Sequence, residues 1–387
     1  MLHKSNFRVR FHLETPSQTF SIGETIGGCV LITSHRSSSP PQFNLALEGK
    51  VNVQVDLSEN AVPLPQPTAS TTFLHMSQPL DDPSIQAAGK ALDAGVEYCL
   101  PFEFVVPCKL PLQACQHSCR HEQVQEEHLS LPPSLGTLGH RKKSLHGKDD
   151  MAPETASIAY QISLRISKKP SKAGTTAPIA EWEHPIHIRP FRVERAPALV
   201  PRESKFYCLR REVTITRGLS RAPQGVLSAQ AVQPTAIAPN AIPFRLVPID
   251  LHYRALSGAP PPKLSAIKVE LQATSFFGVK PWSDFPDLTD PVTWGRHQNH
   301  YTYPVSLADM QPGPLKWQQK NTDDETSPIF RSTIQVPVEL PGKFDYPPSF
   351  SHCFISRVYA LKVDICWRTP GAWGRNRVSL TVPLQIL

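Results

Sequence analysis

The sequence predicts an all-β protein made of two tandem immunoglobulin-like β-sandwich lobes. Several short stretches alternate apolar and polar residues, a pattern typical of strands that bury one face. The 387 residues include 41 prolines, and proline at this density interrupts helices and marks turns and strand edges. Landmarks of the first half recur in the second half in the same order, which indicates two lobes of one design.

The first elements of the chain are expected to be strands. Apolar residues alternate over 7–13, and we expect a first strand there. A β-hairpin is expected over 20–33, and its Gly27-Gly28 pair indicates a place where another group approaches the backbone closely. Alternation over 43–55 predicts further strands that cover this hairpin. The stretch 60–95 has little periodicity and is expected to be mostly loop.

The two lobes are expected at 1–191 and 206–387, because a chain of this length exceeds what one core usually serves. Inside the first lobe, 112–156 is rich in polar residues and is expected to be a mobile insertion outside both cores. Strands are expected to resume after it, at 158–166 and 185–188.

Three landmarks recur in order. They are Val-Pro-x-x-Leu-Pro at 106–111 and 336–341, an alternating strand at 158–166 and 357–365, and Pro-aliphatic-x-Ile at 185–188 and 383–386. The second landmark matches Tyr160 with Tyr359 and keeps the apolar positions in register. We therefore predict that the two tyrosines lie on structurally equivalent strands.

Segments of both lobes also resemble a known family. The stretches GETIGG, PFEFVVPCKLP and FISRVYALKV, in this order, are similar to the fungal α-arrestin group of arrestin-like proteins, and the resemblance covers both lobes. It implies a non-catalytic cytoplasmic adaptor or scaffold, peripheral at the plasma membrane or endosomes, in the trafficking or ubiquitin-dependent endocytosis of plasma-membrane proteins. Its partners would be the tails of membrane-protein cargo. A ubiquitin-independent signalling or sorting scaffold is the alternative, and a metal-binding β-sandwich protein or hydrolase is the competing class.

The net charge of the chain indicates which kinds of partner its surface favours. The formal net charge of +7 favours acidic partners, such as anionic lipids and acidic tails. The predicted basic surface comprises Lys168, Lys169, Lys172, Arg210 and Arg211. An alternative, which stays open, is that these charges are simply solvated loop and strand ends. Nucleic acid is not expected, because no stacking aromatic residues stand among them.

The family recruits WW-domain ubiquitin ligases through PPxY segments, and the sequence departs from that pattern. Its proline pairs precede Phe43, Leu135 and Phe350, and no PPxY occurs. We expect the two phenylalanines to point into the core instead. This argues against direct recruitment of a ligase.

One group of residues has the chemistry of a zinc site. It consists of Cys108, Cys115, His117, Cys119 and His121, and thiolate and imidazole are ligands that zinc prefers. The group lacks a tight C-x-x-C pair, so we assign no metal and no cofactor. No catalytic motif occurs either, so we expect no enzyme and name no catalytic residue.

Overall fold

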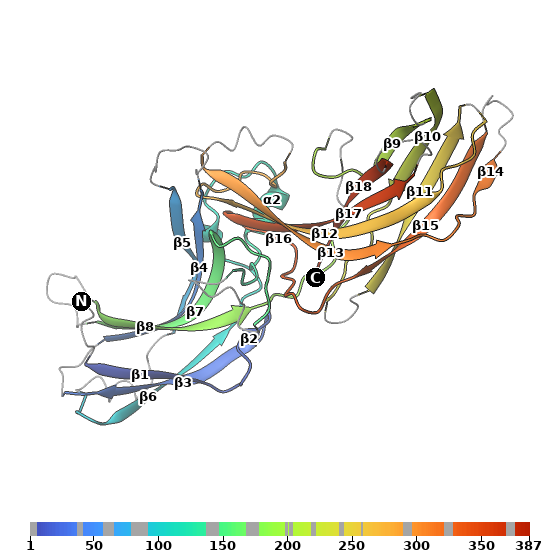
Figure 1. Ribbon diagram of the computed structural model, residues 1–387. Helices are drawn as coiled ribbons and strands as arrows, with labels where there is room; N and C mark the ends of the chain where they lie inside the picture. Colours follow the sequence, from blue (N-terminus) through green and yellow to red (C-terminus); the bar gives the residue numbers. More distant parts are fainter. Residues whose placement is uncertain are drawn as a thin grey trace. The chain divides into compact units, whose positions relative to one another are not determined.

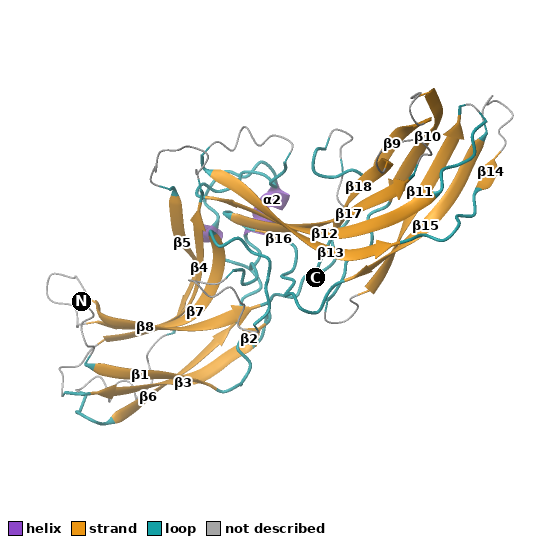
Figure 2. Ribbon diagram, viewed as in Figure 1, coloured by secondary structure: helices purple, strands orange, loops and turns teal. Residues whose placement is uncertain are grey.

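A computed structural model describes residues 6–36, 42–56, 66–78, 92–136, 147–167, 178–197, 200, 204–217, 222–239, 244–256, 258–288, 296–320, 328–368 and 376–387. Strands dominate these residues, and the helices are the 3₁₀-helix η1 (Leu112–Ala114) and α2 (Glu122–His128) (Figure 2). The predicted all-β class is confirmed. No helix within the described ranges is long and apolar enough to cross a membrane.

The chain separates into two compact units. Unit 1 comprises 1–191, 277–285 and 350–355, and unit 2 comprises 192–276, 286–349 and 356–387. Two short segments of the second half of the chain therefore complete unit 1 instead of unit 2.

Unit 1 contains two sheets, with the strand orders β1-β3-β6 and β2-β8-β7-β4-β5 (Figure 1). The strands of these sheets are β1 (Phe7–Leu13), β2 (Thr19–Phe20), β3 (Thr25–Ser34), β4 (Gln42–Gln54), β5 (Thr68–Ser77), β6 (Glu97–Val105), β7 (Ala156–Ser167) and β8 (Pro178–Ile188). The short strand β16 (Phe350–Ser351) also lies in unit 1 but belongs to neither sheet. Buried side chains from both sheets form one hydrophobic cluster, with Val30 from the first sheet and Leu45 and Ile162 from the second. The two sheets thus cover each other's apolar faces.

The segments β2 and β3 belong to different sheets. Phe20 on β2 lies opposite Ile188 in a parallel pair with β8, whereas β3 pairs with β1 and β6. The expected hairpin over 20–33 is therefore wrong. Gly23, with φ of +80°, turns the chain, and its amide donates to the carbonyl oxygen of Val106 over 2.9 Å. Alternating burial is the same whether neighbouring strands pair with each other or with distant strands, so the pattern cannot reveal this crossing.

The Gly27-Gly28 pair lies where other groups approach the backbone. A Cβ at Gly28 would lie 2.2 Å from the carbonyl oxygen of His12 and 2.8 Å from the ring of Phe102. A Cβ at Gly27 would lie 2.6 Å from the carboxylate of Glu14. The predicted close approach is confirmed, and it comes from both neighbours of β3.

Two stretches contribute more to unit 1 than expected. The stretch 60–95 contains the strand β5, which buries Phe73 and Leu74. Its burial does not alternate, so a search for period two misses it. The stretch 112–156 was expected outside both cores, and this is wrong for its described part, because Leu129, Leu131 and Leu135 join the core cluster.

Unit 2 also contains two sheets. Their orders are β14-β15-β11-β10-β9, and β13-β12-β17 with β18 paired to β17. The strands are β9 (Arg210–Arg217), β10 (Ala222–Ala231), β11 (Phe244–Ala255), β12 (Leu264–Gly278), β13 (Gln298–Met310), β14 (Gln318–Lys320), β15 (Ile329–Glu339), β17 (Ile355–Trp367) and β18 (Asn376–Leu384). Leu251 and Val336 of the first sheet and Leu271 and Leu361 of the second are fully buried.

Unit 2 repeats the strand topology of unit 1. The neighbours β1-β3-β6 correspond to β10-β11-β15, and β5-β4-β7-β8 correspond to β13-β12-β17-β18. Tyr160 on β7 lies opposite Ile186 on β8, and Tyr359 on β17 lies opposite Leu384 on β18. The predicted equivalence of the two tyrosines is therefore confirmed.

Candidate functional site

The predicted basic surface is only partly visible. Lys168, Lys169 and Lys172 lie outside the described residues. Arg210 and Arg211 begin β9 and are exposed. Successive residues of a strand point to opposite faces, so these two arginines do not form a patch on one face. Arg210 also pairs with Glu212, with 2.8 Å between guanidinium and carboxylate.

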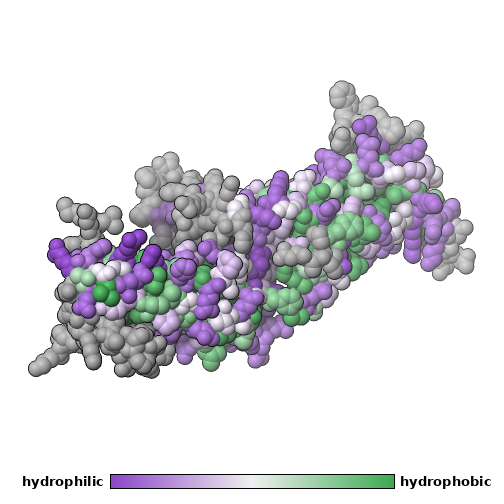
Figure 3. Space-filling model, turned by 90° about the horizontal axis from the view of Figure 1, so that it is seen from below, coloured by the Kyte–Doolittle hydropathy of each residue, from purple (hydrophilic) through white to green (hydrophobic). Residues whose placement is uncertain are grey.

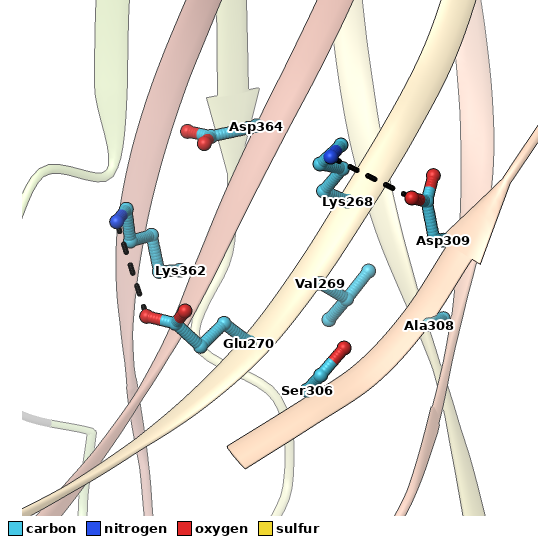
Figure 4. Close-up of a pocket in the computed structure, with 8 residues that line it drawn as sticks. All are labelled: Lys268, Val269, Glu270, Ser306, Ala308, Asp309, Lys362 and Asp364. Atoms are coloured by element: carbon cyan, nitrogen blue, oxygen red, sulfur yellow. Dashed lines mark ion pairs between the residues drawn. The ribbon is translucent and has the colours of Figure 1, made fainter. Parts of the chain in front are cut away.

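The wider surface has a mixed character. On the face drawn in Figure 3, hydrophilic residues are interspersed with hydrophobic ones. The described surface of unit 2 includes a pocket of about 220 Å³ in which four of the charged side chains form two ion pairs (Figure 4). Lys268 lies 3.6 Å from Asp309, and Lys362 lies 3.8 Å from Glu270. These pairs already neutralise much of the charge that a ligand would meet.

The proline pairs serve the fold of each unit. Phe43 and Phe350 are buried, as predicted. After the pairs at 132–133 and 347–348, Ser134 bonds the end of β8, and Ser349 bonds the chain two residues beyond the end of β18. Their amides donate to Ile188 and Ile386 over 2.8 Å each, and their hydroxyls accept from the amides of the same isoleucines over 2.9 and 3.1 Å.

Four cysteine and histidine side chains of unit 1 converge around η1 and α2. Potential ligand atoms of Cys115, His117, Cys119 and His128 all lie within 4.8 Å of one another. The first three follow η1 within five residues, and His128 is the last residue of α2. The local sequence thus presents three ligands on one loop, and the helix returns the fourth.

This group differs from the one that the sequence suggested. Cys115, His117 and Cys119 are brought together, whereas Cys108 and His121 are exposed and do not take part. His128 was missed because it lies nine positions after Cys119, beyond the spacing of a compact ligand pair. The sequence did contain a weak indication of its position. Val124 and His128 are four residues apart and so lie on one face of a helix, and they are the two buried residues of α2.

The distances within the group are short. Sγ of Cys115 lies 3.7 Å from Sγ of Cys119, 3.4 Å from Nε2 of His117 and 3.8 Å from Nδ1 of His128. Nδ1 of His128 also lies 3.7 Å from Sγ of Cys119. The nitrogen of His117 that lies nearest Cys119 is Nδ1, at 4.0 Å from its Sγ. Two sulfurs and two imidazole rings therefore lie close together.

Burial shapes the electrostatics of these four residues. It lowers the pKa of His128 to about 4, and the nearby His117 adds to the effect. It raises the pKa of Cys119 to about 11, with a further contribution from Cys115. Neutral imidazole is the form that binds metals. Nε2 of His128 has no hydrogen-bond partner among the described residues, although it is buried.

Two residues from the second half of the chain adjoin the group within unit 1. Burial and the thiols of Cys115 and Cys119 raise the pKa of Cys353. Its Sγ lies 3.7 Å from the carbonyl oxygen of Ala114. Burial lowers the pKa of His352 to about 3, and His128 contributes. A third thiol and a third imidazole thus border the four side chains.

A second group of titratable residues in unit 1 is an ion-pair network. The carboxylate of Glu48 is buried and lies 3.0 Å from Lys50 and 2.9 Å from Arg165. Glu181 and Glu183 pair with the same two cations. Burial favours a higher pKa for Glu48, but the hydrogen bond and charge of Lys50, together with Arg165 and His75, lower it. Three carboxylates thus share two cations, and each carboxylate already has a basic partner.

No protein-family model and no curated protein matches this chain. Two thiols and two imidazoles at these separations are suited to hold a cation of the zinc class.

Proposed function

We propose that this chain is an arrestin-like, non-catalytic cytoplasmic adaptor in the trafficking of plasma-membrane proteins. The observation that carries the proposal is the repetition of one strand topology, with the same tyrosine register, in two units. Two modules in one chain suit an adaptor, because each can hold a different partner and raise the effective concentration of the other.

Cargo tails are the proposed partners, and β9 offers a way to hold them. It is the terminal strand of its sheet among the described strands, and it begins with Arg210 and Arg211. An extended acidic peptide can pair with such an edge through its backbone, while arginines on both faces meet its carboxylates or phosphates. The lysines at 168, 169 and 172 are proposed to extend this binding or to contact anionic lipid.

Membrane attachment is proposed to be peripheral and reversible. Each basic residue close to an anionic leaflet contributes about 1 kcal/mol at best, and salt weakens this attraction. A few such residues therefore give weak attraction to the membrane, so that the adaptor can bind the membrane and dissociate from it again.

The residues that follow the proline pairs have structural contacts, which favours a scaffold that does not use these pairs to recruit a ligase. The serines that follow two of these pairs bond Ile188 and Ile386, and the phenylalanines that follow two are buried. We therefore keep ubiquitin-independent sorting or signalling as the second candidate function. In the first candidate function, linkage to a WW-domain ligase would run through some other segment or partner.

Binding assays with matched charge variants test the proposal. We expect purified protein to bind acidic or phosphorylated receptor-tail peptides in pull-down, and Arg210→Glu/Arg211→Glu to weaken binding by about tenfold. Arg254→Glu is the control, since Arg254 is exposed on the inner strand β11 of the same sheet. Proximity labelling in cells should recover membrane proteins. Failure to bind any acidic tail, together with labelling that recovers no membrane protein, would overturn the adaptor proposal.

A further inference from the structure

We propose that Cys115, His117, Cys119 and His128 bind one zinc ion, which fixes the segment 112–131 on unit 1. This site is independent of the adaptor function, because it rests on a different part of the chain from β9.

The separations fit a tetrahedral zinc centre. With Zn–S of about 2.3 Å and Zn–N of about 2.0–2.1 Å, a tetrahedron places two sulfurs about 3.8 Å apart and a sulfur and a nitrogen about 3.6 Å apart. The observed S–S separation of Cys115 and Cys119 is 3.7 Å. The separations from Nδ1 of His128 to the two sulfurs are 3.8 and 3.7 Å, and Nε2 of His117 lies 3.4 Å from Cys115.

Charge and burial fit the same ion. Zn²⁺ with two thiolates and two neutral imidazoles has no net charge, which suits a buried position. Cys115 is 4% exposed and His128 is fully buried. The two thiol protons would pass to solvent when the metal binds. Four protein ligands leave no open position for water, so the centre is structural and not hydrolytic.

The segment needs such a cross-link. The helix α2 has seven residues, and helices shorter than about 12–15 residues are marginal on their own. At the base of the segment, the amide of Leu110 donates to the carbonyl oxygen of Leu129 over 2.7 Å. At its tip, the amide of Arg120 donates to Ser283 over 2.8 Å. Between these ties, the four ligands are positioned to close the loop around one ion.

Two other arrangements compete with this assignment. Cys115 and Cys119 could form a disulfide, although their sulfurs are 3.7 Å apart and a disulfide bond is about 2.05 Å long. Cys353 could replace one ligand, since its thiol borders Cys115. Mass spectrometry would detect the disulfide, and the zinc content of a Cys353→Ser variant would reveal a ligand role for Cys353.

Metal analysis of the full-length chain tests the proposal. We expect purified wild-type protein to contain about one zinc per chain, and His128→Asn and Cys119→Ser to lower this content about fivefold or more. Cys108→Ser and His121→Asn are matched controls and should keep the metal, because neither side chain joins the group. Cys353→Ser should also keep it, and loss of zinc in that variant would overturn the four-ligand assignment.

A second measurement covers variants that fold poorly. Zinc removed from wild-type protein by a chelator should lower the melting temperature by several degrees, and added zinc should restore it. Co²⁺ in place of zinc should show the visible absorption of tetrahedral cobalt with thiolate ligands. Wild-type protein that contains no metal and shows no such absorption overturns the proposal, as does a Cys115–Cys119 disulfide found by mass spectrometry in protein purified without oxidant.

Discussion

The hydroxyl groups of Tyr160 and Tyr359 make the same hydrogen bond in the two units. Tyr160 donates to the carbonyl oxygen of Pro132 over 2.6 Å, and Tyr359 donates to that of Pro347 over 2.8 Å. Each proline opens a Pro-Pro-Ser segment, and both tyrosines are buried. The internal repeat thus includes a segment that the sequence landmarks did not pair.

Removing either hydroxyl should destabilise the corresponding unit. We expect Tyr160→Phe and Tyr359→Phe each to cost about 1–3 kcal/mol, because a buried proline carbonyl loses its donor while the ring stays in place. Urea unfolding measures the change. Tyr303→Phe is the control, since the ring of Tyr303 packs on Phe344 and should keep doing so. Equal stability of all three variants would contradict a structural role for the hydroxyls.

A side chain at Gly28 should disrupt the first sheet of unit 1. Gly28→Ala places a methyl group 2.2 Å from the carbonyl oxygen of His12, so the strands β1 and β3 must move apart. We expect a loss of about 1–3 kcal/mol or more in the free energy of unfolding. Gly313→Ala should be nearly neutral, since nothing lies within 4 Å of a Cβ there. Thermal unfolding of both variants measures the difference.

The described part of the segment after Pro111 should matter for stability. Leu131 is fully buried in the core cluster, so Leu131→Ala should cost about 2–5 kcal/mol. Leu112 lies in the same segment and is 73% exposed, so Leu112→Ala should change stability little. Chemical denaturation of both proteins gives the comparison. A Leu131→Ala protein as stable as wild type would show that the segment adds nothing to the core.

The ion-pair network should make unit 1 less stable in acid. The pKa of Glu48 is below its ordinary value of 4.5, so the folded state favours the carboxylate. Its contribution is therefore complete above that value and is lost as the pH falls through the lower folded-state pKa. We expect Glu48→Gln to cost about 1–3 kcal/mol at neutral pH, because Lys50 and Arg165 lose their shared partner.

The same variant should also flatten the dependence of stability on pH. Unfolding free energies measured from neutral pH to below 4.5 should converge for wild type and Glu48→Gln as the pH falls. Glu97→Gln is the control, since Glu97 belongs to an exposed pair and should have little effect. Parallel curves for wild type and Glu48→Gln would contradict the assignment.

Local patterns in the sequence were enough to predict the all-β class, many of the strands and the internal repeat. Alternation of apolar residues is a local property, because side chains of a strand point to opposite faces in turn. It therefore located β1, β4 and β7, and it matched Tyr160 with Tyr359 before any fold was known. The glycine pair was equally readable, since a residue without Cβ marks a close approach whatever the approaching group is.

Contacts between groups far apart in the sequence could be seen only once the chain was folded. Alternation does not name a strand's partner, so the separation of β2 and β3 into two sheets was hidden. His128 joined Cys115 and Cys119 because α2 turns its last residue back toward their loop, and Cys353 came close from far along the chain. Such contacts depend on how the chain packs, and packing sums many weak interactions that no short stretch of sequence records.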